Sequence, residues 1–541
     1  MNNPSTLGTP ARGGDREKLA GTLDLLKLAA TAICLVAVLA KIISVTQFVF
    51  NDGRLVPAFS ILHGNPPFDL PGQGLLINSM YGPLSYLYFA PCILLAHNIS
   101  LALMAGSVLS FTAFVLPVGL IVYRRRADLS NLQMAWLVTL CLLQILFYAS
   151  FSYSAFNIHA DGPAILFSSL CVLALDRREG EAVTPLQNLW FSAALAVMTI
   201  WTKQTYAAVV FLPMLVVLLE KHSWRDRILL AGWIGLLNLI FLLVFLLWCG
   251  ADALWQNLVK IPGSIPTMQA SFLYGPDPSA AGGAAGHLRS LVISCHIMAG
   301  KYITPYLLLL LAYPVVMLKG NQTTGTGRLS LKLPRLAGFF FLLALFNLPL
   351  AADAAIKLSG PSVNDDTAFA WFLLLAVFCL GLELYTRPPS RPAEPLNRVF
   401  FAMFMAISLA GLGGAAIHLP RYLHTIAKPF ANDEAMVAAA CRQSPGKYYF
   451  PWNPAAVYSA EGKIYNWEHI AEFSASVAKK QGWEEYKRHL PPQARIIGVP
   501  ADHAESTTNF LGSYFQNIRP CPGPSVPGSD HFAWFSFERG P

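Results

Sequence analysis

Two aspartates and a set of lysines stand at the ends of apolar runs in this sequence. Asp52 comes directly after the first apolar run, and Asp161 follows two further runs. A carboxylate at the edge of a hydrocarbon layer is costly unless it has a function. A carboxylate can take a proton from an attacking hydroxyl group, and lysines can stabilise a phosphate leaving group. These residue types therefore suit a group transfer at a membrane surface.

Each acid also has a structural interpretation. Asp52 could cap or solvate a helix end, and Asp161 could be the N-cap of the run that it opens, because Asp is well suited to that position. His159, two residues before Asp161, could hold a phosphate or hydroxyl group or make a structural contact. The residue types alone leave both interpretations open.

Three lysines stand near the same ends of apolar runs. Lys203 interrupts an apolar double run at its turn, Lys357 occupies a similar place, and Lys41 lies inside the first run, about three turns before Asp52. Each could reach outward to the interface as an anchor, or pair with an anionic group. Three lysines near two carboxylates favour a site.

The composition is that of a membrane protein. Hydrophobic residues make up 55% of the 541 residues and charged residues 13%, and the mean hydropathy is +0.48. A soluble domain carries about 25% charged residues. The net charge of +8 is sorted between loops, which indicates membrane topology rather than nucleic-acid binding. Residues 1–27 do not resemble a cleaved signal peptide.

Apolar runs of sufficient length predict eleven membrane-spanning helices. These are 28–49, 101–123, 132–150, 161–176, 187–202, 205–220, 228–249, 302–318, 336–352, 367–386 and 399–418. Residues 83–97 are also apolar, but they are short, contain an internal proline and are rich in aromatic residues. We expect them to form a helix at the membrane interface, within a long and structured first outer loop.

The distribution of Lys and Arg predicts the orientation. Alternate connecting segments, including 124–131 and 220–227, hold 19 of these residues, whereas the intervening loops hold six. The positive-inside rule places the first set in the cytoplasm. The N-terminus is then cytoplasmic, and the tail from about residue 420 is extracytoplasmic.

The sequence divides into three parts. Residues 1–27 are a cytoplasmic segment, 28–419 a transmembrane domain, and 420–541 a small α/β domain with a helix near 470–489 and a strand at 494–499. Nine cysteines are scattered without metal-ligand spacing. Cys441 and Cys521 lie in the tail, where a disulfide between them could form if that region is extracytoplasmic.

The order of these features resembles the GT-C superfamily of membrane glycosyltransferases, which use polyprenyl-phosphate sugars. Protein O-mannosyltransferases and aminoarabinose transferases are relatives. The shared order is a first span, an outer-loop Asp, a segment opening Tyr81-Gly82-Pro83-Leu84-Ser85-Tyr86, two spans, a second Asp, and a span pair with an outer Lys-Gln. The resemblance covers roughly residues 28–420 and implies a GT-C-like bundle of about eleven transmembrane helices.

The resemblance also implies roles for individual residues. Asp52 matches the catalytic acid and Asp161 the second acidic position, Lys203 matches an outer basic position, and Lys357 falls in a loop that some members share. Tyr81 is expected to contact substrate. The second acid is single rather than part of an Asp-X-Asp pair, and one carboxylate with a His is a thin shell for Mg²⁺ or Mn²⁺. Transfer without a divalent metal or other cofactor is therefore expected.

The expected function is transfer of a sugar from a polyprenyl-phosphate donor to an extracytoplasmic glycan, lipid or protein. Asp52 would be the general base of an inverting displacement, and His159, Asp161, Lys203, Lys357 and Lys41 would hold acceptor or donor. The expected location is the bacterial inner membrane, with membrane lipids and no nucleic acid as partners. The alternatives are a transporter or flippase, a glycan polymerase or ligase, and a non-catalytic scaffold.

Overall fold

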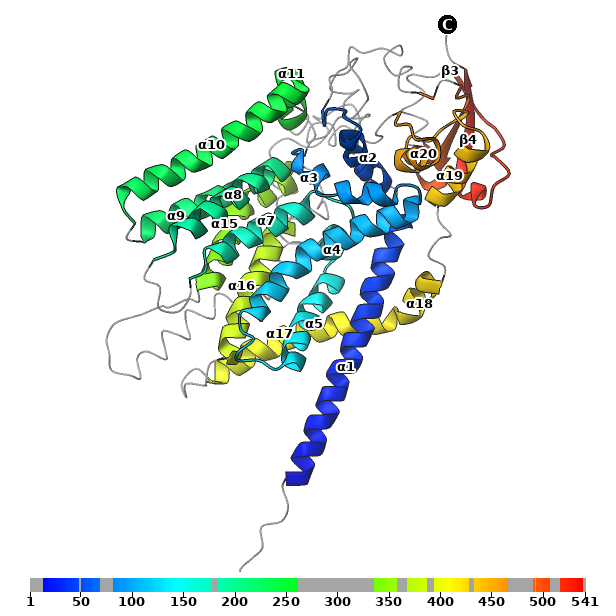
Figure 1. The fold of residues 1–541 in the computed structure, drawn as a ribbon. Coiled ribbons are helices and arrows are strands. Elements are labelled where there is room, and N and C mark those ends of the chain that lie inside the picture. The colour runs from blue at the N-terminus through cyan, green and yellow to red at the C-terminus, as the bar shows by residue number, and fades with distance from the viewer. Residues whose placement is uncertain are drawn as a thin grey trace, which may run out of the picture.

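Most of the chain is helical, and a small sheet lies near the C-terminus (Figure 1). The computed structural model describes residues 13–47, 50–68, 81–177, 183–220, 222–260, 335–357, 367–386, 394–427, 433–465, 490–491, 493–505 and 516–538.

The helical part begins with the long helix α1, which extends below the rest of the molecule in Figure 1. Its helices are α1 (Gly13–Ser44), α2 (Phe50–Leu62), α3 (Leu84–Leu87), α4 (Ile99–Tyr123), α5 (Asn131–Phe147), α6 (Ala149–Phe156), α7 (Asp161–Ala174), α8 (Leu186–Thr202), α9 (Phe211–Leu219), α10 (Trp224–Cys249), α11 (Ala251–Trp255), α15 (Arg335–Lys357), α16 (Thr367–Thr386), α17 (Glu394–Ile417) and α18 (Leu419–Ala427). Short helical turns are η1 (Val45–Gln47), η2 (Ala90–Leu95), η3 (Gln204–Val210) and η4 (Gln256–Lys260).

Among the residues that the structure describes, three helices are long and apolar enough to cross a membrane. They are Gly21–Ser44 within α1, Ile99–Tyr123 (α4) and Trp224–Cys249 (α10). Shorter apolar helices occupy 131–147, 161–174, 204–219, 335–348, 367–383 and 404–417. Ten of the eleven predicted spans thus fall on helical segments of the described chain, and 302–318 lies outside the described residues. The number of spans stays a prediction.

The helices pack around one large apolar cluster that draws on α1, α4 to α10 and α15 to α17. Trp371 of α16 is fully buried at its centre and stacks edge-on against Phe114 of α4 and Phe151 of α6. Because aromatic rings bury a large area and pack with specific geometry, these contacts fix α16 against helices that lie far away in sequence.

The segment between α1 and α4 is folded, as expected for a structured first loop. Residues 83–97, predicted to be one interfacial helix, form the two short elements α3 and η2. Neither element is long enough to span a bilayer. Asp52, predicted in a loop, instead lies in the first turn of α2.

The C-terminal region forms a four-stranded sheet with helices. Its elements are α19 (Asp433–Gln443), β1 (Tyr448–Tyr449), α20 (Pro454–Glu461), β2 (Ile496–Pro500), η7 (Ala501–His503), β3 (Gln516–Pro520), η8 (Ser529–His531) and β4 (Phe532–Glu538). The strand order is β1-β2-β4-β3, with β1 and β2 parallel and the other pairs antiparallel. The predicted strand 494–499 corresponds to β2, and the predicted helix 470–489 lies outside the described residues.

The core of the C-terminal region continues into the first outer segment. One apolar cluster joins residues of α19, α20 and β4 to residues of α2, α3, η2 and α4. Phe59 of α2 and Tyr458 of α20, for example, have ring centroids 5.2 Å apart. The C-terminal sheet and helices therefore share buried apolar surface with the helical part.

Cys441 and Cys521 are free thiols in the structure. Cys441 of α19 is buried, and Cys521, directly after β3, is partly exposed. The disulfide considered from the sequence is therefore not formed here.

Candidate functional site

Two helix ends bring Asp161 and Lys203 together. Asp161 is the first residue of α7, and Lys203 follows the last residue of α8. Since α7 and α8 lie side by side, the start of one meets the end of the other. The backbone of Lys203 is extended (φ −150°, ψ 114°), which ends α8 before η3 begins. The polar Lys203 interrupts the apolar run as the sequence indicated.

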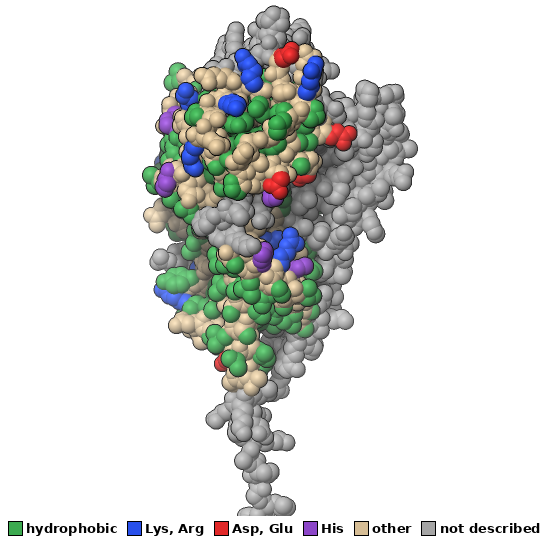
Figure 2. Space-filling view, turned by 90° about the vertical axis from the view of Figure 1, so that its right-hand side faces the viewer, with side chains coloured by type: hydrophobic (Ala, Val, Ile, Leu, Met, Phe, Trp, Pro, Cys, Tyr) green, Lys and Arg blue, Asp and Glu red, His purple; other side chains and the backbone are tan. Residues whose placement is uncertain are grey.

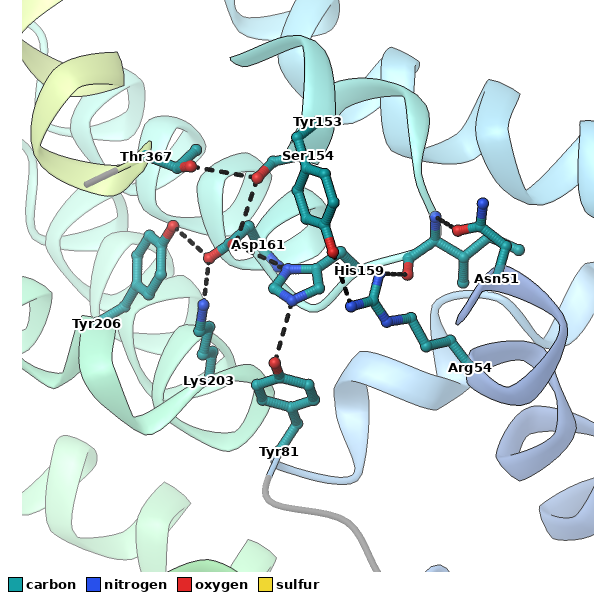
Figure 3. Close-up of polar contacts among 11 residues, drawn as sticks. Asn51, Arg54, Tyr81, Tyr153, Ser154, His159, Asp161, Lys203, Tyr206 and Thr367 are labelled. Atoms are coloured by element: carbon teal, nitrogen blue, oxygen red, sulfur yellow. Dashed lines mark hydrogen bonds and ion pairs between the residues drawn. The ribbon is translucent and has the colours of Figure 1, made fainter. Parts of the chain in front are cut away.

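The carboxylate of Asp161 is the centre of a buried polar network (Figure 3). Lys203 Nζ lies 2.6 Å from Oδ1, and the Tyr206 hydroxyl donates to the same oxygen at 2.9 Å. His159 Nδ1 lies 2.7 Å from Oδ2. Asp161 is 1% exposed, so its charge depends on these partners rather than on water. Hereafter the Asp161 centre means Tyr81, His159, Asp161, Lys203 and Tyr206.

A relay of contacts connects Asp161 to Tyr81. The 2.7 Å contact between Nδ1 of His159 and the carboxylate favours the tautomer with its proton on Nδ1 over the competing 3.3 Å contact of Nδ1 with the backbone N–H of Asp161. In that tautomer Nε2 is an acceptor. The Tyr81 hydroxyl lies 3.0 Å from Nε2 and donates to it. Burial lowers the pKa of His159 to about 4, despite the opposing charge of Asp161. The imidazole is therefore neutral at pH 7. Tyr81 is the partly exposed end of the relay.

Arg54 adds a second cation beside the centre. Its guanidinium donates to the Tyr153 hydroxyl at 3.0 Å and to the carbonyl oxygen of Ile158 at 3.4 Å. Its positive charge acts on both His159 and Tyr81. Arg54, Tyr153 and Tyr206 were not among the residues predicted for the site. A sequence signal existed for Arg54, because it is the one Lys or Arg in the first outer loop.

Further polar groups fix the position of α2 and of the loop before α7. The side chain of Asn51 donates to Asn157 Oδ1 at 2.9 Å and accepts from the backbone N–H of Ile158 at 2.8 Å. Ser154 Oγ lies 3.2 Å from Thr367 Oγ1 and 3.5 Å from Asp161 Oδ2. The start of α2 is thereby attached to the loop that carries His159.

Asp52 lies in a different environment. Its carboxylate oxygens accept backbone N–H groups of Ala455 at 2.5 Å and Ala456 at 2.9 Å, at the start of α20. The side chain is fully buried, and burial raises its pKa to about 8, although the two N–H groups oppose the shift. The carboxylate thus caps a helix of the C-terminal region. It makes no direct contact with the Asp161 centre among the contacts of the described residues.

A second buried carboxyl group lies near Asp52. Glu434 of α19 is 1% exposed, and burial together with the charge of Asp52 raises its pKa well above the ordinary value. Two nearby carboxyl groups in a dry interface cannot both ionise cheaply. The contact between α2 and the C-terminal region therefore favours protonation of at least one of the two acids.

Two predicted site residues lie outside the Asp161 centre. Lys41 stands in the last turn of α1, where Arg421 of α18 is its charged neighbour. Lys357 is the last residue of α15, and its side chain is not described. Tyr81, His159, Asp161 and Lys203 are the predicted residues that the fold brings together.

Within the described ranges, no group of three or more His, Cys, Asp and Glu side chains is arranged to hold a metal ion. Asp161 has a lysine, a tyrosine and a histidine as partners, so its oxygens already have donors. Transfer without a metal remains a prediction.

The opposite end of α7 is rich in arginine. Arg124, directly after α4, lies 2.6 Å from Asp176 and donates to the carbonyl oxygen of Leu173 at 2.7 Å. Arg335 of α15 lies 2.6 Å from Glu220, directly after α9. The 14 residues of α7 rise about 21 Å, which separates this basic end from the Asp161 centre.

The comparisons with known proteins give matches to solved structures but none by sequence. No family model matches the chain, and no curated protein matches it by sequence. Two solved structures of ArnT from Cupriavidus metallidurans are similar in fold. The one bound to undecaprenyl phosphate has a TM-score of 0.47 and 12% identity over 94% of this chain and 97% of that chain. The apo state has a TM-score of 0.43 and 11% identity over 96% and 98%. Likeness at this level assigns no activity to this chain.

Proposed function

We propose that this protein is a membrane glycosyltransferase that moves a sugar from a polyprenyl-phosphate donor to an extracytoplasmic glycan, lipid or protein. The observation that carries the proposal is the Asp161 centre, a buried carboxylate with Lys203, Tyr206 and the His159–Tyr81 relay at one end of the bundle. Buried ionisable groups within a membrane bundle are functional candidates by default.

Sidedness supports this assignment. Arg124 and Arg335 lie at the other end of the bundle from the Asp161 centre. The positive-inside rule puts the arginine-rich end in the cytoplasm, and the Asp161 centre then faces the extracytoplasmic side. A sugar donor held by a lipid tail would reach this end from within the bilayer. The preferred location is the bacterial inner membrane, as the resemblance to the GT-C superfamily implies.

The chemistry requires a base and a cationic site for the leaving group. A hydroxyl oxygen of the acceptor attacks the anomeric carbon, the carbon–oxygen bond to the phosphate breaks, and the hydroxyl proton passes to a carboxylate. Lys203 and Arg54 would attract the departing phosphate, because fixed cations stabilise developing negative charge in a site that excludes water. Tyr81, held by His159, would orient the substrate.

Asp52 remains the proposed base. A base works best when its pKa is close to the operating pH. Burial raises the pKa of Asp52 to about 8, so contact with substrate and solvent must lower that pKa again before the carboxylate can accept a proton. In the folded chain its oxygens are engaged by the N–H groups of Ala455 and Ala456. Proton transfer would therefore need the start of α20 to move off the carboxylate. A single displacement with one carboxylate gives inversion at the sugar carbon.

The test is label transfer from radioactive polyprenyl-phosphate sugars in membranes that contain the full chain. Asp52→Asn should lower transfer by about 100-fold or more, the scale of a lost acid–base contribution. Tyr81→Phe should lower transfer by about 100-fold, the scale of a misplaced substrate. Tyr88→Phe is the matched control, because the Tyr88 hydroxyl donates to the carbonyl oxygen of Leu109, in the middle of α4.

Thermal unfolding of each variant establishes that the chain is folded. Loss of transfer in both variants with normal unfolding supports the proposal. Transfer that persists in both variants would reject these roles. If wild-type membranes move a lipid-linked substrate across the bilayer without forming a glycosidic bond, the protein is a transporter or flippase.

A further inference from the structure

The helix α18 has the pattern of a helix that lies on a membrane surface. Its apolar residues Leu419, Tyr422, Leu423 and Ile426 recur at the spacing of one helical face. The other face carries Arg421 and polar residues. α18 packs beside α1, yet Leu423 is 53% exposed. Its apolar face is therefore only partly covered by protein.

The position of α18 is set by two apolar helices. α17 ends at Ile417, which is 77% exposed, and α18 begins two residues later. The apolar stretch of α1 ends at Ser44, and Lys41 stands in its last turn. A candidate membrane helix, α1, and a shorter apolar helix, α17, thus end next to α18, as expected for an element at the bilayer surface.

Basic groups gather where α18 meets α1. Arg421 is exposed, and because α18 packs against α1, it lies close enough to Lys41 for the two positive charges to interact. His418 and His424 are each three residues from Arg421 and share its side of the helix. Figure 2 shows basic and His side chains together below the C-terminal region, above a largely hydrophobic surface.

This basic group has no acidic partner in the described part of the chain. α18 contains no Asp or Glu, and neither do residues 31–44 of α1 or 402–417 of α17. The ion pairs among the described residues include none with Lys41 or Arg421. Two positive charges near a low-dielectric layer repel each other. The proximity of Lys41 and Arg421 is therefore favourable only when an anion lies beside them.

We propose that Lys41 and Arg421, with His418 and His424 beside them, bind the phosphate group of an anionic phospholipid. The apolar face of α18 would lie among the acyl chains, and the basic face would hold the headgroup. Clusters of basic residues on interfacial helices recognise anionic lipids in this way. The site is separate from the Asp161 centre, and it does not depend on the proposed glycosyl transfer.

The test is native mass spectrometry of the full chain in detergent, titrated with short-chain phosphatidylglycerol or phosphatidylcholine. The double variant Lys41→Gln/Arg421→Gln should bind phosphatidylglycerol about 30-fold more weakly, because each basic side chain near an anionic surface contributes about fivefold. Binding of the zwitterionic phosphatidylcholine should stay the same.

The matched control is Lys447→Gln/Arg519→Gln, which removes two exposed basic residues from the C-terminal region. It should bind phosphatidylglycerol as the wild type does. If the first double variant does not fold, Arg421→Gln alone is the test, because Arg421 is exposed, and about fivefold weaker binding is expected.

Two results would overturn the inference. One is unchanged phosphatidylglycerol affinity in the folded variant. The other is a variant that binds a polyprenyl phosphate probe more weakly but binds phosphatidylglycerol as the wild type does. That result would assign these basic residues to the donor's phosphate instead. Label transfer measured in parallel separates this result from failure of the proposed function.

Discussion

At the scale of single residues, the pairing of Asp161 with Lys203 decides the character of the site. The Asp161 carboxylate is 1% exposed and the Lys203 side chain 11%, so each charge relies on the other. A buried ion pair is weak support for stability as a whole, but removal of one partner leaves an uncompensated charge. The pair therefore couples α7 to the end of α8 tightly.

Lys203→Met should lower the free energy of unfolding by about 3–5 kcal/mol, because it strands the Asp161 carboxylate. The double variant Asp161→Asn/Lys203→Met should be more stable than Lys203→Met alone. Denaturant unfolding in detergent measures both. Lys27→Met is the control, since Lys27 forms a surface pair with Asp24 worth about 0–1 kcal/mol. Equal stability of the single and double variants would show that the two charges are independent.

At the scale of elements, the segment that carries Tyr81 is held against the end of α8. The backbone N–H of Gly82 donates to the carbonyl oxygen of Thr202 at 3.0 Å. A Cβ atom at Gly82 would lie 2.0 Å from the carbonyl oxygen of Trp201. Only glycine allows this approach, so Gly82 fixes where Tyr81 meets His159.

Gly82→Ala should destabilise the protein by about 1–3 kcal/mol, as overpacking of a tight contact does, and should also lower label transfer. Melting temperature and transfer rate are the two measurements. Gly232→Ala in α10 is the control, because no atom lies within 4 Å of the added Cβ. A Gly82→Ala protein with normal melting and normal transfer would contradict the role given to this contact.

The attachment of α20 to α2 should depend on pH. Because the pKa of Asp52 rises from 3.8 to about 8 on folding, the folded state holds a proton that the unfolded chain releases. This stabilisation is complete below about pH 4 and is lost as pH rises through about 8. Glu434 adds to the same trend, since its pKa is also raised.

The melting temperature, measured from pH 4 to pH 9, tests this dependence of stability on the protonation of Asp52. The wild type should lose stability toward high pH, and Asp52→Asn should show a flatter profile, because the amide does not titrate. Asp530→Asn, at an exposed position, should keep the wild-type profile. Parallel profiles for the wild type and Asp52→Asn would refute the pH coupling.

At the scale of the whole molecule, the C-terminal region and the helical part share one apolar cluster. Phe59, Phe89 and Leu103 come from the first outer segment and α4, whereas Phe450 and Trp534 come from the sheet region. Neither side keeps its buried surface without the other. The sequence predicted a small C-terminal domain over 420–541, and that division stays a prediction; the packing shows that this region shares an apolar cluster with the helical part.

A chain that ends at Ala427 should therefore expose a large apolar patch and aggregate. Size-exclusion chromatography in mild detergent is the measurement. Trp534→Ala in the full chain is a milder test of the same contact. It should lower the free energy of unfolding by about 3–5 kcal/mol, because Trp534 is only 7% exposed. A truncated chain that is monodisperse and melts as the full chain does would contradict the shared core.

The helical pattern and the candidate polar groups could be predicted from the amino-acid sequence alone. Apolar runs end where Asp161 and Lys203 stand, because a charge is tolerated at the end of an apolar helix and not in its middle. Local composition therefore located α7, α8 and their polar ends. It also located β2 from a short run of apolar residues before Pro500.

Which polar groups meet depends on how the helices and the C-terminal region pack in three dimensions. Asp52 bonds to Ala455, 403 residues later, and Lys41 lies near Arg421, because the packing of distant apolar faces brings these segments together. Hydrophobic periodicity shows which face of an element is buried, but not against which partner. The meeting of Asp161 with Lys203 could be predicted in part, because the start of one span and the end of the next lie on the same side of a membrane. The partners of Asp52 and Lys41 could not be predicted, because they depend on contacts between residues far apart in the sequence.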